Sequence, residues 1–348
     1  MSRLLDNAPY GPRDEDAFLA EMNRLTEHHL NACDEYAKVW PDWRPATAAE
    51  QLPYLHVSTF KWIDFRSSGA DIKHERTLLS SATTSGTPSR IALDEKSSEL
   101  QSRSSLAILA DFVGRSARPL LVVDSARSLR MRGEVSARIA AAMSLRPLAS
   151  DIYFLLAAPE DPSSMKWDAL GDILDQYDEF LVYGFTWILH TAWGAAAVPD
   201  EIRSKLAGRK ICFVHSGGWK KLEAARVTRE AFDDGLLAGL STESKVVDFY
   251  GLVEQVGVIY PLCDHGFRHP PVWADVIVRD PITLAPLLNE SGLLQLLNVL
   301  ASGAPYHSVL TEDVGRIIPG ECPCERSGKR FELLGRLPKS EARGCANV

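Results

Sequence analysis

KICFVHSGG, at residues 210–218, is a short apolar run that ends in two glycines, and runs of this kind decide the fold. The others are PLLVVDS (119–125), DIYFLLA (151–157), EFLVYGF (179–185), KVVDFYG (245–251) and ADVIVRD (274–280). Between them, residues 94–113, 132–145 and 219–238 show helical periodicity. Strands that alternate with helices of this length indicate an α/β fold with a largely parallel sheet.

The chain of 348 residues has no internal repeat and no low-complexity linker. We therefore expect one domain over residues 1–348, although the length alone would also allow two. Apolar residues between Asp14 and Trp40 recur at helical spacing. This pattern predicts one amphipathic helix inside an N-terminal helical segment, residues 1–60.

Composition excludes several classes of protein. Hydrophobic residues make up 45% and charged residues 24%, as in soluble globular proteins, and the net charge is −8 with no block of basic residues. Nucleic acid and anionic membranes are therefore not expected as partners. The longest apolar runs are too short to span a bilayer, and the N-terminus has no signal-peptide core. We expect a cytoplasmic protein whose six cysteines serve metal binding or catalysis.

Polar and glycine residues follow several of the predicted strands, where α/β proteins bind ligands. Gly217 and Gly218 follow one strand, and Glu254 lies just beyond another in GLVEQVG. Asp313 occurs in TEDVGRI, and Arg336 in a Gly-Arg pair near the end of the chain. Singly, each has an ordinary explanation as a turn, a solvated acid or a loop.

The stretch LLSSATTSGTPSRI, residues 78–91, combines hydroxyl side chains with one glycine. Small residues allow backbone N–H groups to approach phosphate oxygens, and hydroxyls add hydrogen bonds. The lysine that closes the Walker pattern is missing, so the usual P-loop interpretation fails. A phosphate-binding loop and a Ser/Thr-rich surface turn both remain open at this point.

In order, the hydroxyl loop, the Gly-Gly turn, YGxxEQ, the Asp-x-Gly segment and the Gly-Arg pair resemble the motifs of the adenylate-forming superfamily. The sequence most closely resembles acyl-protein synthetases of the LuxE type, and more distantly phenylacetate–CoA ligases. The segments that carry the resemblance are HSGGWK (215–220), YGLVEQVGVIYPLC (250–263), RDPITLAP (279–286), LTEDVGRI (310–317) and GRLPKSEARGC (335–345). The resemblance implies the large N-terminal-type domain of that superfamily, with layered sheets and helices. The small C-terminal domain that usually follows the Gly-Arg motif is expected to be absent, since the chain ends at Val348.

The resemblance assigns the hydroxyl loop to ATP. Laid on the superfamily pattern SSGTTGxxPS, the loop would cradle the β- and γ-phosphates, and a second alignment takes Ser85-Gly86-Thr87 as the hairpin. Ala82 and Ser85 stand where the pattern has glycine, which raises the alternative of a degenerate loop. The expected phosphate contacts are Ser81, Thr83, Thr84 and Ser85.

The same resemblance gives roles to the residues at the strand ends. Glu254 would coordinate Mg²⁺, for which a carboxylate oxygen is suited. Gly217 and Gly218 would let a flat ligand approach the backbone, and Asp313 would bind the ribose hydroxyls. The remaining candidates are Tyr250 and Gly251 beside the adenine or acyl-adenylate, Arg336 near the ribose or α-phosphate, and Lys220 as a further cation or a solvated surface residue.

A second set of residues has the chemistry of a metal site. Cys263, His269, Cys322 and Cys324 supply the thiolates and imidazole that tetrahedral zinc prefers, and some phenylacetate–CoA ligases carry a metal at similarly placed residues. We expect a structural zinc within residues 255–330, with His265 as the competing ligand to His269. The alternative is a set of buried thiols beside an unrelated histidine, because Cys-x-Cys is tighter than the usual spacing.

Together these features predict an enzyme that activates a carboxylic acid with MgATP, releases pyrophosphate and transfers the acyl group from AMP to a thiol. In the LuxE pattern that thiol would be Cys345, and the acyl group would then pass to a partner such as a reductase or carrier protein. One alternative is a stand-alone ligase that loads CoA or a carrier protein; another is a degenerate AMP- or acyl-binding protein. Residues 183–194 are either acyl-pocket lining or core.

Overall fold

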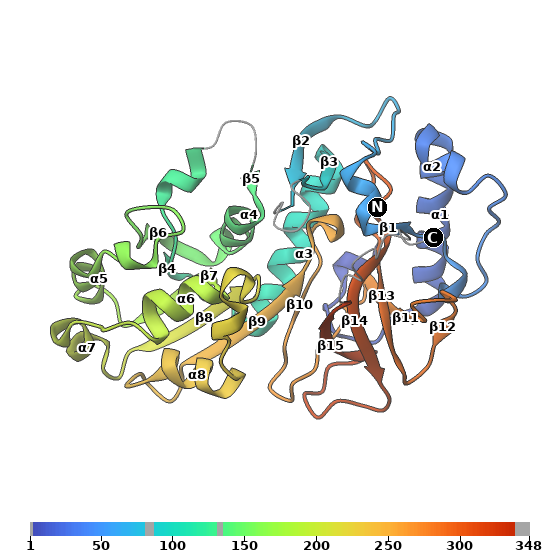
Figure 1. The fold of residues 1–348 in the computed structure, drawn as a ribbon. Helices are drawn as coiled ribbons and strands as arrows, with labels where there is room; N and C mark the ends of the chain where they lie inside the picture. The colour runs from blue at the N-terminus through green and yellow to red at the C-terminus, as the bar shows by residue number, and fades with distance from the viewer. Residues whose placement is uncertain (1–2, 81–86, 131–134, 338–348) are drawn as a thin grey trace, which may run out of the picture.

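The computed structural model describes residues 3–80, 87–130 and 135–337 and contains three sheets. The first has the strand order β10-β9-β8-β7-β4-β6, and all its pairs are parallel except β10 with β9. Its strands are β4 (Arg118–Val122), β6 (Ala149–Phe154), β7 (Glu179–Phe185), β8 (Lys210–Ser216), β9 (Lys245–Gly251) and β10 (Ile259–Pro261). Helices pack around this sheet (Figure 1): α3 (Glu95–Val113), α4 (Ala137–Ser144), α5 (Trp167–Leu174), α6 (Thr186–Leu189), α7 (Asp200–Leu206) and α8 (Arg229–Leu237).

The second sheet is mostly antiparallel, in the order β1-β14-β13-β11-β12, with β15 paired to β14. Its strands are β1 (Leu55–His56), β11 (Ala274–Arg279), β12 (Pro286–Leu287), β13 (Ser291–Asn298), β14 (Ser308–Ile318) and β15 (Arg330–Arg336). The N-terminal helices α1 (Glu15–Ala32) and α2 (Asp34–Val39) lie beside this sheet (Figure 1). A third sheet joins β2 (His74–Leu79), β3 (Arg90–Asp94) and β5 (Val135–Ser136).

Five of the six predicted strands form the parallel sheet, and its central strands β4, β7 and β8 are covered on both faces. In β7 and β8 every residue after the first is buried. The placement of residues 274–280 in that sheet is wrong, since β11 pairs antiparallel with β13 in the second sheet. All six residues of β11 are buried, so its sequence looks like a parallel strand although its partners are antiparallel. Likewise TEDVGRI lies within β14 and is not a loop.

The predicted single N-terminal helix is interrupted at Cys33, which ends α1 and precedes α2. Cys33 has an extended backbone and a buried side chain. The backbone amide of Ser68 donates to the Ala32 carbonyl at 2.7 Å, so a distant segment takes an acceptor at the end of the helix. Residues 219–238 are also divided, into η8 (Lys220–Ala225) and α8.

Helix α3 joins the two large sheets. The hydroxyl of Ser104 in α3 donates to the Gly257 carbonyl at 2.6 Å, beyond β9. It also accepts the indole N–H of Trp273, at 2.7 Å, just before β11. Trp273 is fully buried, and one hydrophobic cluster contains residues of α1, α3 and both large sheets. That 1–348 forms a single domain stays our interpretation. Within the described ranges, no helix is both long and apolar enough to cross a membrane.

Two buried histidines hold α1 against the second sheet. The rings of His29 and His307 stack with centroids 5.0 Å apart. The Thr26 hydroxyl donates to the Met22 carbonyl, so it must accept a proton from His307 Nε2, 3.0 Å away. His307 Nδ1 is then the unprotonated nitrogen, and it is buried without a hydrogen-bond partner in the described structure. Burial lowers the pKa of His307 to about 3 and holds that of His29 well below its ordinary value.

These pKa values predict acid-labile folding. Because both values are lower in the folded chain than in the unfolded one, the unfolded state binds more protons below about pH 6.5. The contribution of these two neutral histidines to the free energy of unfolding is complete above that pH and is lost progressively as pH falls toward 3. We expect chemical denaturation to show a smaller loss of stability between pH 6.5 and 4.5 in His307→Gln, which keeps a donor for Thr26. The control His265→Gln, at an exposed position, should retain the wild-type slope.

Candidate active site and metal centre

The Gly-Gly turn follows β8 at the carboxyl edge of the parallel sheet. Gly217 and Gly218 have φ values of +85° and +63°, which favour glycine. A Cβ atom on Gly217 would lie 3.0 Å from the ring of Phe185, so this position also excludes side chains sterically. Since β8 pairs directly with β9, the turn lies near the end of β9, where Tyr250 and Gly251 are found.

Tyr250, Asp313 and Arg336 form a hydrogen-bonded group that links the two large sheets. The Tyr250 hydroxyl donates to Asp313 Oδ2 at 2.8 Å, and Arg336 Nε donates to Asp313 Oδ1 at 3.0 Å. Asp313 and Arg336 are cross-strand partners of β14 and β15, while Tyr250 belongs to β9. Sheet register therefore pairs the Asp313 and Arg336 motifs, and the packing of the two sheets brings Tyr250 to them.

The electrostatics fix the protonation states in this group. Burial, and next the charge of Asp313, hold the pKa of Tyr250 well above its ordinary value, so its hydroxyl stays protonated and donates. Burial lowers the pKa of Arg336, but the charge and hydrogen bond of Asp313, together with the charges of Glu312 and Tyr250, leave it above its ordinary value. A carboxylate has about four acceptor sites. The two protein contacts leave Asp313 able to accept from further hydroxyl groups.

Glu254 follows β9 in the short helix η9 (Val253–Gln255) and is 5% exposed. Burial raises the pKa of its carboxyl group, whereas the Ser89 hydroxyl and the charges of Lys61 and Arg336 lower it. Ser89 stands at the end of the hydroxyl loop. There its backbone N–H donates to Ser80 Oγ at 2.8 Å, closing the hairpin. Glu254 thus faces both the loop base and the Arg336 side of the site.

Several predicted site residues lie outside the described residues. They are Ser81, Thr83, Thr84 and Ser85 of the loop and Cys345 near the C-terminus. Lys220 begins η8, and its side chain also lies outside the described part of the chain. Their roles stay predictions.

The segment 183–194 is packed mainly as core. Ile188 and Leu189 are fully buried, and the ring of Trp193 contacts Phe213 edge-on at 5.4 Å. Beside it, His215 Nδ1 lies 3.0 Å from the Thr186 hydroxyl, and burial lowers the pKa of His215 to about 4. This segment supports the neighbouring Gly-Gly turn through apolar packing.

Four residues near the site were not among the predicted site residues. Lys61 and Ser89 act on the Glu254 carboxyl group, and the Thr311 hydroxyl accepts the backbone N–H of Asp313 at 3.1 Å. The fourth, Gln255, is fully buried directly after Glu254. Three of them lie in segments that the sequence singles out: Ser89 in the hydroxyl loop, Thr311 in LTEDVGRI and Gln255 in YGxxEQ. Lys61, at the end of η3 (Val57–Lys61), had no sequence signal and is found only from its place in the structure.

The predicted metal ligands come together. One ligand atom each of Cys263, His269, Cys322 and Cys324 lies within 4.8 Å of the others. A tetrahedral zinc with Zn–S bonds of about 2.3 Å separates two sulfur ligands by about 3.8 Å. The Sγ atoms of Cys263 and Cys322 are 3.9 Å apart, and Cys324 Sγ lies 3.3 Å from His269 Nε2. The residues therefore fit zinc, and of the two candidate histidines it is His269 whose ring lies in the cluster.

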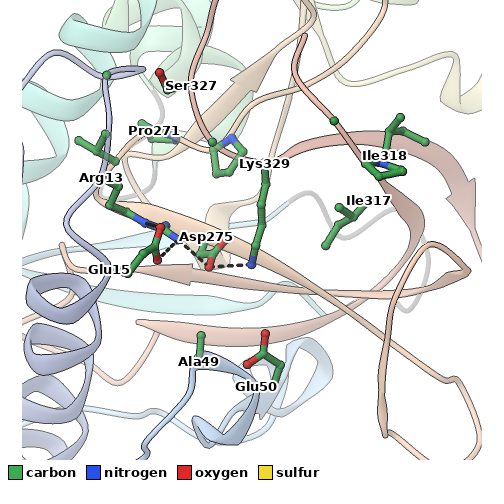
Figure 2. A pocket seen from close by; sticks show the side chains of 16 residues that line it. Arg13, Glu15, Ala49, Glu50, Pro271, Asp275, Ile317, Ile318, Ser327 and Lys329 are labelled. Atoms are coloured by element: carbon green, nitrogen blue, oxygen red, sulfur yellow. Dashed lines mark hydrogen bonds and ion pairs between the residues drawn. The ribbon is translucent and has the colours of Figure 1, made fainter.

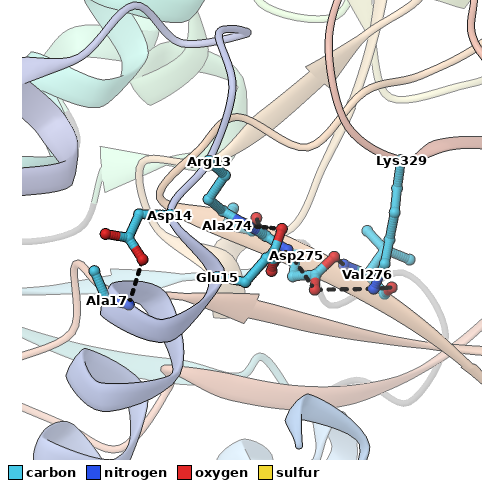
Figure 3. Close-up of polar contacts among 8 residues, drawn as sticks. All are labelled: Arg13, Asp14, Glu15, Ala17, Ala274, Asp275, Val276 and Lys329. Carbon is cyan, nitrogen blue, oxygen red and sulfur yellow. Dashed lines mark hydrogen bonds and ion pairs between the residues drawn. The ribbon is translucent and has the colours of Figure 1, made fainter.

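A cavity of about 540 Å³ opens beside the segment that follows His269 (Figure 2). At its floor, buried Asp275 accepts from Arg13 at 3.0 Å and from Lys329 at 2.9 Å (Figure 3). Arg13 also donates to the Ala274 carbonyl and Lys329 to the Val276 carbonyl. Among the described residues, the cavity lining includes none of those predicted to bind nucleotide. This ion-pair group connects two segments to β11: the N-terminal segment that contains Arg13, and the β14–β15 connection that contains Cys322, Cys324 and Lys329.

Comparison with known sequences gives the family. The profile of the acyl-protein synthetase family LuxE matches residues 12–348. The chain belongs to the LuxE acyl-protein synthetase family. Two curated members of similar sequence are the long-chain-fatty-acid–luciferin-component ligases of Vibrio harveyi, 30% identical over 142 residues, and of Aliivibrio fischeri, 25% identical over 142 residues. Each match covers 40% of this chain, and the chain spans 36% and 37% of the length of these relatives.

Solved structures show which fold this LuxE-family chain adopts. An open conformation of 2-hydroxyisobutyryl-CoA ligase superposes with a TM-score of 0.69 at 15% identity, covering 95% of this chain and 76% of that one. The same ligase in its postadenylation state gives 0.67 at 16% identity, covering 93% and 68%. The predicted fold class, an α/β fold with layered sheets and helices, is confirmed by this likeness to acyl-CoA ligase structures.

A zinc prediction follows from the cluster geometry. Protein purified without chelators should contain about one zinc per chain by atomic emission, and Cys322→Ser should contain far less, with a lower melting temperature. The control is Cys33→Ser, a buried thiol outside the cluster, which should keep its zinc. Well under one zinc in the wild-type protein would contradict the assignment.

Proposed function

We propose that this chain activates a carboxylic acid with MgATP to form an acyl-adenylate and pyrophosphate, and then passes the acyl group to a thiol. The observation that carries the proposal is the convergence of Tyr250, Asp313 and Arg336 with Glu254 at the carboxyl edge of the parallel sheet. Family membership supports the same reaction class. The acceptor protein would be a reductase or carrier protein in the cytoplasm, where thiols stay reduced.

In the first half-reaction a carboxylate oxygen of the acid attacks the α-phosphorus of ATP, and the bond to pyrophosphate breaks. The chain's contribution would be orientation and charge balance, so no nucleophilic side chain is needed for this step. Asp313 would hold the ribose hydroxyls with its remaining acceptor sites. Arg336, whose side chain is half exposed, would oppose charge developing near the α-phosphate.

Glu254 would be the protein ligand for Mg²⁺. The residue fits this role because its carboxyl group is buried beside the base of the hydroxyl loop, and burial without a cation disfavours its charged form. When bound, Mg²⁺ neutralises charge on the phosphates of ATP. The loop residues Ser81, Thr83, Thr84 and Ser85, Lys220 and the Gly217-Gly218 turn would complete the contacts with phosphates and adenine.

Acid-dependent exchange of labelled pyrophosphate into ATP tests adenylation. Glu254→Gln keeps the shape but removes the charge, so exchange should fall by about a hundredfold or more, given that a metal contact supplies several kcal/mol. The matched control Glu290→Gln, at an exposed position outside the site, should exchange normally. AMP binding without exchange for any acid in a broad panel would favour the degenerate binding protein.

In the second half-reaction we infer that Cys345 receives the acyl group. Its thiolate would attack the carbonyl carbon, the C–O bond to phosphate would break and AMP would leave, with the thiol proton released to solvent. Arg343, two residues away in the sequence, would favour the thiolate form. The acyl-thioester would then be handed to the partner protein.

Intact mass after incubation with ATP and the preferred acid checks this step. A hydroxylamine-labile acyl adduct should form on the wild-type chain and be absent from Cys345→Ser, while pyrophosphate exchange continues in both. Transfer to CoA or a carrier protein by the Cys345→Ser variant at the wild-type rate would instead identify a stand-alone ligase.

A further inference from the structure

The amide of Gln255 connects the Glu254 turn to the second sheet. Gln255 is fully buried. Its Nε2 donates to the Leu296 carbonyl at 3.1 Å and to the Tyr306 carbonyl at 3.0 Å. Its Oε1 accepts from Asn298 Nδ2 at 3.0 Å. One side chain from η9 is therefore tied to β13 and to the segment that leads into β14.

Asn298 makes this connection rigid. Its Nδ2 also donates to the Tyr306 carbonyl at 3.1 Å, and its Oδ1 accepts the backbone N–H of Leu300 at 2.9 Å. Both amides thus share the Tyr306 carbonyl at the β13–β14 connection. Because every polar atom of the Gln255 amide is used, rotation of this side chain would leave buried groups unpaired, which costs about 1–3 kcal/mol for each.

The position of this group bears on the proposed active site. Gln255 adjoins Glu254, and the 3-10 turn that holds both is closed by the hydrogen bond from Gln255 N–H to the Leu252 carbonyl. On the other side, β14 carries Asp313. The Gln255 amide is thus a polar link between the strand-end turn with the proposed metal ligand and the sheet with the proposed ribose ligand.

We propose that Gln255 is a positioning residue that holds the Glu254 carboxylate at a fixed place relative to Asp313, and so sets the affinity of the site for Mg²⁺ with ATP. This inference rests on the proposed function for the role of Glu254. Groups that orient a metal ligand through hydrogen bonds change metal affinity by about 10–100-fold when removed. Gln255 would act through its neighbour, since its amide is bonded to Leu296, Tyr306 and Asn298 of the protein.

Another buried glutamine supplies a matched control. Gln295 on β13 is also fully buried, and its Nε2 donates to Ser308 Oγ at 2.9 Å. Its Oε1 accepts from Arg279. Its Nε2 also donates to the Leu52 carbonyl at 3.5 Å. None of these partners belongs to η9, so Gln295→Met should destabilise the fold without moving the η9 turn. Gln255→Met removes a similar set of contacts from a similar environment, but it cuts the link between the second sheet and the η9 turn that carries Glu254.

The experiment measures the Mg²⁺ concentration that gives half of the ATP-induced rise in melting temperature, a binding readout that does not need turnover. Gln255→Met should require at least about tenfold more Mg²⁺ than the wild type. Gln295→Met should lose a comparable amount of thermal stability and keep the wild-type Mg²⁺ dependence. Asn298→Ala removes one partner of Gln255 and keeps the glutamine, so it should raise the Mg²⁺ requirement by a smaller factor. This variant takes the place of Gln255→Met in the test if Gln255→Met does not fold.

Equal Mg²⁺ dependence in the Gln255, Asn298 and Gln295 variants would overturn the inference, as would a wild-type chain whose ATP binding ignores Mg²⁺. Pyrophosphate exchange is measured separately on the same proteins. Absence of exchange in the wild type, together with a Mg²⁺ shift in Gln255→Met, would reject the proposed reaction and support the positioning role. Normal exchange in the wild type, together with an unchanged Mg²⁺ dependence in Gln255→Met, would support the proposed reaction and reject the positioning role.

Discussion

The hydrogen bond between the Tyr250 hydroxyl and the Asp313 carboxylate is the contact on which the arrangement of the site depends. It joins the end of a parallel strand to an antiparallel strand of the other large sheet. Asp313 also receives Arg336, so one buried carboxylate sets the distance between three motifs that are far apart in the chain. A buried charge needs such partners, because an unpaired carboxylate in this environment would be strongly destabilising.

Other buried polar contacts also join the two large sheets. Ser104 in α3 bridges Gly257 and Trp273, and the Gln255 amide reaches the β13–β14 connection. Each contact uses polar groups that are already buried by the surrounding apolar core, so a shift of one sheet would leave unpaired donors and acceptors on both. The two sheets are therefore held in one relative position near Glu254 and Asp313, which suits a reaction that depends on orientation.

Away from the proposed nucleotide site, charge and thiol groups hold the ends of the described chain together. Arg13 and Lys329 converge on Asp275, and Lys329 belongs to the same hairpin as Cys322 and Cys324. Closing such long loops is where a metal contributes most to folding, because the unfolded chain lacks a preformed site. The ion-pair group thus braces the connections around the second sheet, and a zinc held by the cysteine cluster would add to this.

The sequence by itself determined the parallel strands, the Gly-Gly turn, Glu254 just beyond a strand end and the three cysteines of the candidate metal site, since each rests on local periodicity or residue chemistry. It did not determine that residues 274–280 pair antiparallel or that TEDVGRI forms a strand, because a run buried on both faces looks the same whatever its partners. The choice of His269 over His265, and the contacts of Ser89, Lys61 and Gln255 with the site, were decided by tertiary structure. These residues lie far apart in the sequence, and only the packing of the sheets brings them near one another.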